Sequence, residues 1–408
     1  MPVRGRRTAG PVLAAIVAVT AVTVGLAGPV GASNDAYFDR QWALAQIRAP
    51  EAWARSTGTG ITIGIVDTGV DSTHPDLAAN VVATADCIGR PCASGGGQDT
   101  HGHGTIVSGI AAAAANNGHG GAGVAPDARL VVAKVLNGKG EGRVGDINNG
   151  IRWVVDQGAK VVNLSLGDPN VSVSSVLGTP LRSGIDYAWS RGAVPVLASG
   201  NYGTGSADLG SGNYGSVNAL VVGATNRAGA VPSYSGAIGN AKWGLVAPGG
   251  SGSGGGADSN VLSTFPAAAG GTGYATAAGT SMAAPHVSGA VALLMAQGLT
   301  PAEAVKRLLA TLEKSTPCGS GCQGRLDVAA AVGPRPGAPT PTTAPATTAP
   351  ATTVPVTAAT VPRSTTRVPA PTSTAPTTPT APTAPTAPTV PPRSLWNCGA
   401  SRVRTRSR

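Results

Sequence analysis

The chain has 408 residues, of which 42% are hydrophobic and only 3% aromatic, with 59 glycines and 33 prolines. This apolar content excludes a globally disordered chain and predicts at least one globular domain. The formal net charge is +10, but many basic residues lie near the two ends of the chain rather than along a fold. We therefore expect no nucleic-acid partner.

The first 32 residues have the order of a secretory signal. A basic start is followed by an apolar run from about Pro11 to Ala27 and by small residues that end at Ala32. An uncleaved anchor helix is the alternative, but Gly25 and Gly28 interrupt the run. We expect residues 1–32 to be removed, which leaves no membrane span, and the protein to be secreted or cell-wall associated in a bacterium.

Between Trp42 and Val332, short apolar runs alternate with segments of helical periodicity. The apolar runs are rich in β-branched residues and predict buried strands at Ile61–Val66, Leu130–Val135, Lys160–Leu164, Val194–Ala198 and Leu220–Ala224. Helices are expected at Thr105–Ala115, Val144–Gln157, Leu181–Arg191, Ser281–Ala296 and Pro301–Leu312. The alternation predicts an α/β fold, a doubly wound, mostly parallel sheet with helices on both faces. Ligands of such sheets bind beyond the carboxyl ends of the strands, where Asp67 and Asn201 fall.

The five cysteines agree with export to an oxidising compartment. Cys87 and Cys92 are close in sequence, as are Cys318 and Cys322, so two short local disulfides are the natural pairing. Free buried thiols are the alternative. Cys398 is left over, either free or paired with another molecule.

The composition changes after the globular part. Residues 334–393 are rich in Pro, Thr and Ala in recurring Thr-Ala-Pro units, which predicts a disordered linker or stalk. Residues 394–408 form a basic C-terminal tail with Trp396 and no resemblance to a membrane helix. The tail is expected either to bind an anionic cell-envelope polymer or to be merely solvated.

Three short segments supply an acid, an imidazole and a hydroxyl in chain order. They are Val66-Asp67-Thr68-Gly69, His103-Gly104-Thr105 and Gly279-Thr280-Ser281-Met282-Ala283-Ala284-Pro285-His286. Taken singly, each has a plainer interpretation as a turn cap, a solvated histidine or a helix N-cap. Taken together they are what a serine nucleophile requires, because the hydroxyl needs an imidazole base and the imidazole needs a carboxylate to fix its tautomer.

These motifs, in this order, resemble those of the subtilisin-like serine proteases (subtilases, the peptidase S8 family), and the resemblance covers nearly all of Ser33 to Val332. It implies a monomeric peptidase domain at 33–333 that hydrolyses peptide bonds of polypeptide substrates through an acyl-enzyme. By the resemblance Asp67 orients the imidazole, His103 is general base and then general acid, and Ser281 is the nucleophile. His101 lacks the Gly-Thr that follows His103, and His286 corresponds to a structural helix residue.

The resemblance also implies the groups that surround the reaction. Ala198-Ser199-Gly200-Asn201 is similar to the family's oxyanion-hole loop, which makes the Asn201 side chain a donor together with the Ser281 N–H. Two further segments are similar to those that flank the bound peptide in the family. Ordinary glycine turns are the alternative interpretation. The residues of these two segments are Gly140, Glu141, Gly142, Ser165, Leu166 and Gly167.

A structural calcium ion is the one cofactor that the resemblance implies. Asp35, Asp76 and Asn117 match positions that ligate calcium in relatives, and their hard oxygen donors suit that ion. Plain turn residues are the alternative.

Two other interpretations of the whole chain stay open. Ser33 already resembles mature enzyme sequence, which leaves no room for the family's inhibitory propeptide after the signal; the mycosins, a secretion-associated branch, share this feature but usually end in a membrane helix. A non-catalytic envelope-binding protein that retains the fold is the alternative from a different class. Asp67, His103, Ser281 and Asn201 together argue against it.

Overall fold

The computed structural model describes residues 33–166, 181–203, 216–267 and 273–333, together with short strands at 393–395 and 402–404. The predicted signal at 1–32, the linker from Pro334 to Pro392 and the unpaired Cys398 lie outside the described residues.

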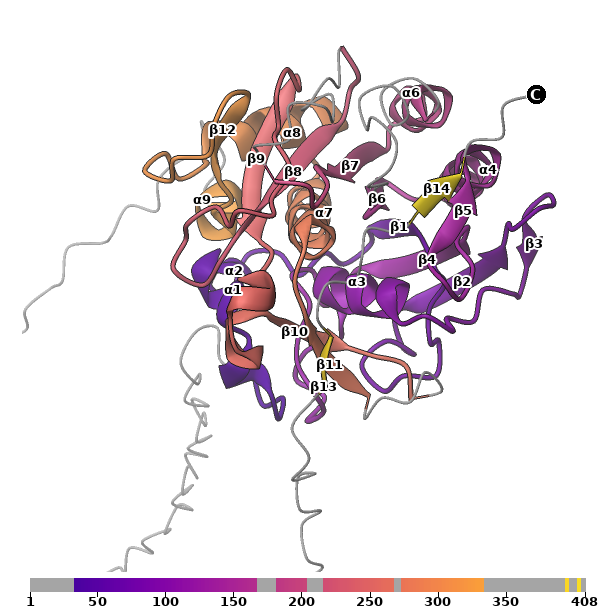
Figure 1. Ribbon diagram of the computed structural model, residues 1–408, viewed down its shortest axis with the longest axis horizontal. Helices are drawn as coiled ribbons and strands as arrows, with labels where there is room; N and C mark the ends of the chain where they lie inside the picture. Colours follow the sequence, from indigo (N-terminus) through magenta and orange to yellow (C-terminus); the bar gives the residue numbers. More distant parts are fainter. Residues whose placement is uncertain are drawn as a thin grey trace, which may run out of the picture.

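A nine-stranded sheet forms the centre of the domain, in the order β12-β9-β8-β7-β6-β1-β4-β2-β3 (Figure 1). Every neighbouring pair is parallel except β2 and β3, so the predicted sheet type is confirmed. The strands are β1 (Thr62–Asp67), β2 (Val81–Asp86), β3 (Ala93–Ser94), β4 (Arg129–Lys134), β6 (Val161–Leu164), β7 (Val194–Ala198), β8 (Leu220–Thr225), β9 (Trp243–Pro248) and β12 (Cys322–Arg325).

Helices cover both faces of this sheet, as expected from buried parallel strands. Alternate residues of β4 enter two separate apolar cores, Leu130 and Val132 one of them and Val131 and Ala133 the other. The first core holds α1 (Trp42–Gln46), α2 (Ala49–Ala52), α3 (His103–Ala112), α7 (Thr280–Ala296), α8 (Pro301–Ala310) and α9 (Val328–Val332), and the second holds α4 (Val144–Asp156) and α6 (Arg182–Ser190). Within the described ranges no single helix is long and apolar enough to cross a membrane, and only the bent pair α7–α8 passes that test jointly.

Smaller strands lie outside the main sheet. β10 (Val261–Thr264), β11 (Tyr274–Ala277) and β13 (Arg393–Leu395) form one group, and β5 (Glu141–Arg143) pairs with β14 (Arg402–Arg404). The sequence pattern predicted none of these, because strands of three or four residues are too short to establish a periodicity.

The five predicted strands and five predicted helices are all present, with ends displaced by a few residues. The largest difference is α3, which begins at His103 and ends at Ala112 rather than running from Thr105 to Ala115. Gly102, in the left-handed region at φ 103°, precedes the helix, and the extended backbone of Ala113 ends it. β2 escaped prediction because most of it is only partly buried, so its apolar signal is weak.

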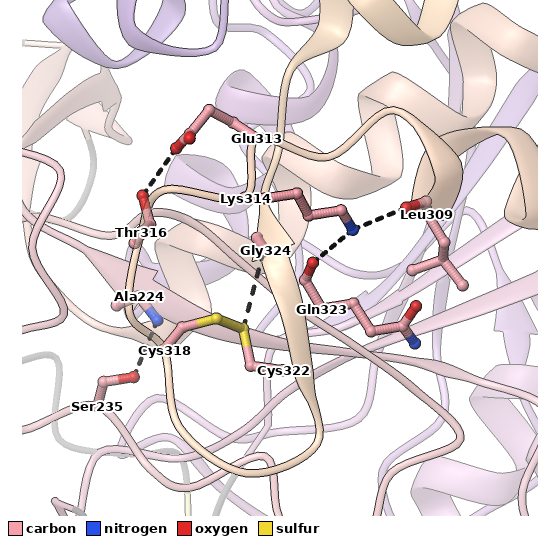
Figure 2. Close-up of a disulfide and its surroundings, with 10 residues drawn as sticks. All are labelled: Ala224, Ser235, Leu309, Glu313, Lys314, Thr316, Cys318, Cys322, Gln323 and Gly324. Carbon is pink, nitrogen blue, oxygen red and sulfur yellow. Dashed lines mark hydrogen bonds between the residues drawn. A yellow bond between two sulfur atoms is a disulfide. The ribbon is translucent and has the colours of Figure 1, made fainter.

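Both predicted disulfides are present, Cys87–Cys92 and Cys318–Cys322. Figure 2 shows the second, which closes the turn that enters the edge strand β12. Beside it, Lys314 Nζ donates to the carbonyl oxygens of Leu309 and Gln323, which ties the chain before the turn to the strand after it.

His286 is a structural residue of α7, as predicted. It is 1% exposed, and its Nδ1–H donates to the Met282 carbonyl oxygen at 2.8 Å. Burial lowers its pKa to about 4, against a smaller opposing effect of this hydrogen bond.

The neutral state of His286 predicts acid sensitivity of the fold. Between the ordinary pKa of 6.5 and about 4, the unfolded chain binds a proton that the folded chain does not, so the free energy of unfolding falls as the pH falls through this window. We expect this residue to contribute about 3 kcal/mol to that loss. In denaturant unfolding, the Ser281→Ala protein, which lacks the predicted nucleophile, should lose more stability on acidification than Ser281→Ala/His286→Gln. Equal losses would contradict the assignment.

Candidate active site

Asp67 is the last residue of β1, in the middle of the main sheet, and its side chain is fully buried. Its Oδ1 accepts a hydrogen bond from Nδ1 of His103 at 2.7 Å and another from the Thr68 backbone N–H at 2.7 Å. The structure thus brings together the predicted acid and imidazole. It also distinguishes the two histidines, because the His101 ring lies 6.3 Å from that of His103 and no hydrogen bond joins it to Asp67 among the described residues.

Two glycines allow His103 to approach Asp67 at the start of α3. A Cβ atom on Gly104 would lie 2.1 Å from the Gly69 carbonyl oxygen, and one on Gly102 would lie 2.1 Å from the Phe265 ring. The glycine of the His-Gly-Thr motif is therefore required by the close contact between α3 and the turn after β1.

Opposing electrostatic effects act on the pKa of His103. Complete burial by itself lowers the pKa of His103, but the Asp67 charge, the hydrogen bond that His103 donates to Asp67 and the Asp99 charge together raise it above the usual value. Nε2 of His103 is buried and has no hydrogen-bond partner in the described part of the chain. This nitrogen is the free end of the imidazole and the only one that can exchange a proton with a substrate or a nucleophile.

Ser281 lies in the first turn of α7, after Gly279, whose φ of 149° makes the sharp entry to the helix. Its Oγ donates to the Ser165 carbonyl oxygen at 3.3 Å. No hydrogen bond joins this hydroxyl to His103 Nε2 among the described residues.

Buried polar side chains form a chain of hydrogen bonds that ends at the backbone of Ser281, the predicted nucleophile. Ser288 Oγ donates to Asn163 Oδ1, Asn163 Nδ2 donates to Ser165 Oγ, and Ser165 Oγ donates to the Ser281 carbonyl oxygen, at 2.8–2.9 Å each. These bonds join β6 to the first turns of α7. Ser165, predicted for substrate binding, therefore also holds the Ser281 backbone in place.

Asn201 follows β7 and faces the same helix terminus. Its Oδ1 accepts from the Thr280 N–H at 2.8 Å and from the Thr280 Oγ1 at 3.0 Å. The amide oxygen is thereby engaged, and the amide nitrogen is left as the donor of this side chain next to Gly279 and Ser281. This is the orientation that the predicted oxyanion role requires.

The two predicted substrate segments lie on either side of Asp67. In the main sheet β6 and β4 are the neighbours of β1; Ser165 and Leu166 follow β6, and the chain after β4 turns back so that Gly142 of β5 bridges Leu136. Gly140 forms the turn before β5 with φ 72°, whereas Gly167 lies outside the described residues.

Asp99 is a residue that the sequence analysis missed. It is fully buried and its oxygens accept from Thr68 Oγ1, from the N–H groups of His101 and Gly102, and from the N–H and Oγ1 of Thr105. Thr68 Oγ1 in turn accepts from the Gly104 N–H, and Lys134 Nζ donates to the Thr68 carbonyl oxygen. Asp99 thus fixes α3 against the turn after Asp67. Its position four residues before His103 was the only signal in the sequence.

The three predicted calcium ligands come together at one loop. Asp35 accepts from the N–H groups of Asn116, Asn117 and Gly118, while Asn117 Nδ2 donates to Asp76 Oδ1. Both carboxylates are buried, and in the described ranges neither has a salt bridge. The two buried carboxylates supply the hard oxygen donors that calcium prefers, and they accept hydrogen bonds from neighbouring N–H and O–H groups. The Asn117 Oδ1 atom accepts from the His119 N–H. The described residues contain no group of three His, Cys, Asp or Glu side chains suited to a metal.

Comparison with known proteins agrees with this geometry. Residues 58–331 match the family model described as the subtilase family. The chain belongs to the subtilase family. Thermitase of Thermoactinomyces vulgaris is 38% identical over 305 residues, which cover 73% of this chain and 98% of thermitase. Subtilisin Savinase of Lederbergia lenta is 41% identical over 255 residues, which cover 62% of this chain and 83% of the relative.

A solved structure of a protease from Pseudoalteromonas arctica superimposes on this subtilase with a TM-score of 0.62 at 33% identity, covering 74% of this chain and 98% of that one. The predicted family and fold are therefore confirmed. Membership makes the protein a serine endopeptidase that acts on polypeptides.

Asp99 should influence the reaction through His103. In Asp99→Asn an amide group replaces an oxygen that accepts from Thr105, which loosens α3, and the loss of charge removes one cause of the raised His103 pKa. We expect kcat to fall on the order of 10²-fold and the pH midpoint of kcat/KM to move down. The exposed Asp127→Asn is the matched control. A lower kcat with an unmoved midpoint would assign Asp99 to packing alone.

Proposed function

We propose that Asp67, His103 and Ser281 form the catalytic triad of this serine endopeptidase. The observation that carries the proposal is the buried 2.7 Å hydrogen bond between Asp67 and His103 Nδ1, which leaves Nε2 as the free proton acceptor. An imidazole held in this way is in the tautomer that a serine nucleophile needs.

The reaction follows from these atoms. As Ser281 Oγ bonds to the substrate carbonyl carbon, His103 Nε2 takes the hydroxyl proton, and the buried Asp67 carboxylate stabilises the resulting imidazolium. His103 then gives that proton to the leaving amine nitrogen as the C–N bond breaks, which leaves an acyl group on Ser281. A water molecule, deprotonated by His103, attacks the ester and releases the acid, and the Ser281 hydroxyl is restored.

The negative oxygen of each tetrahedral intermediate needs donors that are already in place. We propose the Asn201 side-chain amide and the Ser281 backbone N–H for this role. The engagement of Asn201 Oδ1 by Thr280 supports it, because the amide is held before any substrate arrives.

The substrate peptide is proposed to lie extended between β5, with Glu141 and Gly142, and the segment of Ser165 and Leu166. Pairing through the main chain gives affinity without demanding one sequence. The N–H and C=O groups at the β5 edge are suited to such pairing.

We also propose that the protein is bacterial and exported, with residues 1–32 as the signal, and that it acts as a monomer. The basic tail at 394–408 is proposed to bind an anionic cell-envelope polymer. The arginine content of this segment supports electrostatic binding.

Labelling by a fluorophosphonate tests the triad directly. The full chain should be labelled and should digest casein, and Ser281→Ala should do neither because the acylated oxygen is absent. Asn201→Ala should still be labelled but should lose about 10²–10³ in kcat, as expected for removal of one oxyanion donor. Ser190→Ala, which removes an exposed hydroxyl on α6, is the control that should still be labelled. A folded full chain that is not labelled would contradict the proposed catalytic role.

A structural calcium ion is proposed at Asp35, Asp76 and Asn117, where it would join the amino-terminal segment to the loop after α3. Loop carbonyl oxygens would complete its oxygen ligands.

Calcium removal should then lower the melting temperature of the Ser281→Ala protein, since an ion that binds only the folded state stabilises it by mass action. Added calcium should restore the value, and Asp76→Asn should lose most of this response. The response of Asp127→Asn should match that of the parent. A melting temperature unaffected by chelator would contradict a tight site.

A further inference from the structure

The C-terminal tail occupies the edge of β5. Strand β14 runs parallel to β5, with Arg402 opposite Glu141, Val403 opposite Gly142 and Arg404 opposite Arg143. Figure 1 shows β14, drawn in yellow, lying along β5 although the two are far apart in sequence. The tail therefore forms an added strand on the segment proposed to bind substrate.

The β5 edge has room for a single strand. On its other side β5 meets Leu136, through the antiparallel bridge with Gly142 and the hydrogen bond from the Asn137 N–H to the Glu141 carbonyl oxygen. A strand has two edges, so only the edge taken by β14 is left for a peptide. Tail and substrate must compete for the same backbone groups.

This edge is connected by hydrogen bonds to the backbone of Asp67. The N–H groups of Val135 and Leu136 both donate to the Asp67 carbonyl oxygen, and Leu136 is the residue that bridges Gly142. A strand on β5 is thus linked to Asp67 through one intervening residue, Leu136. A strand paired with β5 can therefore block the approach of a substrate to the triad.

A second contact places the tail near the nucleophile. Strand β13 pairs in parallel with β11, with Arg393 opposite Ala275 and Leu395 opposite Ala277. β11 leads within three residues to Thr280, the first residue of α7. The tail is therefore paired at two places, one on the strand before Ser281 and one on β5.

Charge agrees with the register. Arg402 lies opposite Glu141, and the last eight residues, Ser401 to Arg408, contain four arginines and no acidic residue. A basic segment is attracted electrostatically to a strand that carries a carboxylate. The tether also favours it, because a covalently attached segment has an effective concentration of the order of millimolar when the linker can span the distance.

We propose that the C-terminal tail is an intramolecular competitive inhibitor, whose strand β14 (Arg402–Arg404) pairs with β5 and thereby excludes substrate strands. This rests on the proposed role of β5 in substrate binding. It also identifies the class of peptide that the edge accepts, extended segments with arginine opposite Glu141.

The test uses the full chain with two matched double variants. Arg402→Glu/Arg404→Glu places like charge opposite Glu141, and Arg406→Glu/Arg408→Glu makes the same charge change outside the paired strand. With an uncharged fluorogenic peptide, the first variant should show kcat/KM raised at least about tenfold through a lower KM, with kcat unchanged. The second should match the parent, and mass spectrometry should verify that each tail is intact.

A binding measurement separates this inference from the proposed chemistry. A fluorescent peptide of the sequence Ser401–Arg408 should bind Ser281→Ala/Arg402→Glu/Arg404→Glu several times more tightly than it binds Ser281→Ala, because the internal strand has left the edge. Glu141→Gln in the same background should weaken it. Equal kcat/KM in all three active chains, or equal peptide binding with and without the tail substitutions, would overturn the inference. Loss of catalysis in every chain would instead overturn the proposed triad and leave the binding result to decide on the tail.

Discussion

A carboxylate removed from water is costly unless its charge is compensated, and the Asp67–His103 hydrogen bond supplies that compensation at the centre of the fold. Asp67 is fully buried at the end of β1, and His103 is its only ionisable hydrogen-bond partner among the described residues. The arrangement depends on the parallel sheet, which buries the end of β1 between β6 and β4. It also depends on Gly102 and Gly104, since side chains there would hold α3 away. The Asp67 charge that holds the pair together also raises the pKa of His103, against the lowering effect of burial.

Two buried networks of polar side chains hold the helices around the Asp67–His103 pair in place. Asp99 and Thr68 fix the start of α3, and Asn163, Ser165 and Ser288 fix the start of α7. Each network joins a strand or its following turn to a helix terminus, where backbone N–H groups otherwise lack partners. Because every unmade bond in such a network is costly, the networks select one relative position of the two helices. Asp67, His103 and Ser281, the residues proposed for the triad, come from three different elements, so this selection is what aligns them.

The edge of β5 that faces away from Leu136 can pair either with a substrate or with another strand of the same chain. A protease that binds extended peptides needs exposed main-chain groups, yet such an edge pairs with any available strand. In this chain the available strand is its own basic tail. The arginines suited to Glu141 are also those suited to an anionic polymer, so a polymer that binds the tail would compete with β5 for it.

The sequence by itself determined the parallel sheet, five of its strands, five helices and both local disulfides, and it supplied the three motifs proposed to form the triad. These features depend on periodicity, on short spacing or on residue types that one reaction requires, and all are readable along the chain. It did not reveal Asp99 or Asn163, since a buried polar residue looks like any loop or strand residue until its partners are known. It also gave no sign of β5 and β14, which are three residues long and become strands only by meeting each other. Only the tertiary structure decided these contacts, because they join residues far apart in sequence whose pairing energy exists only after the fold has brought them together.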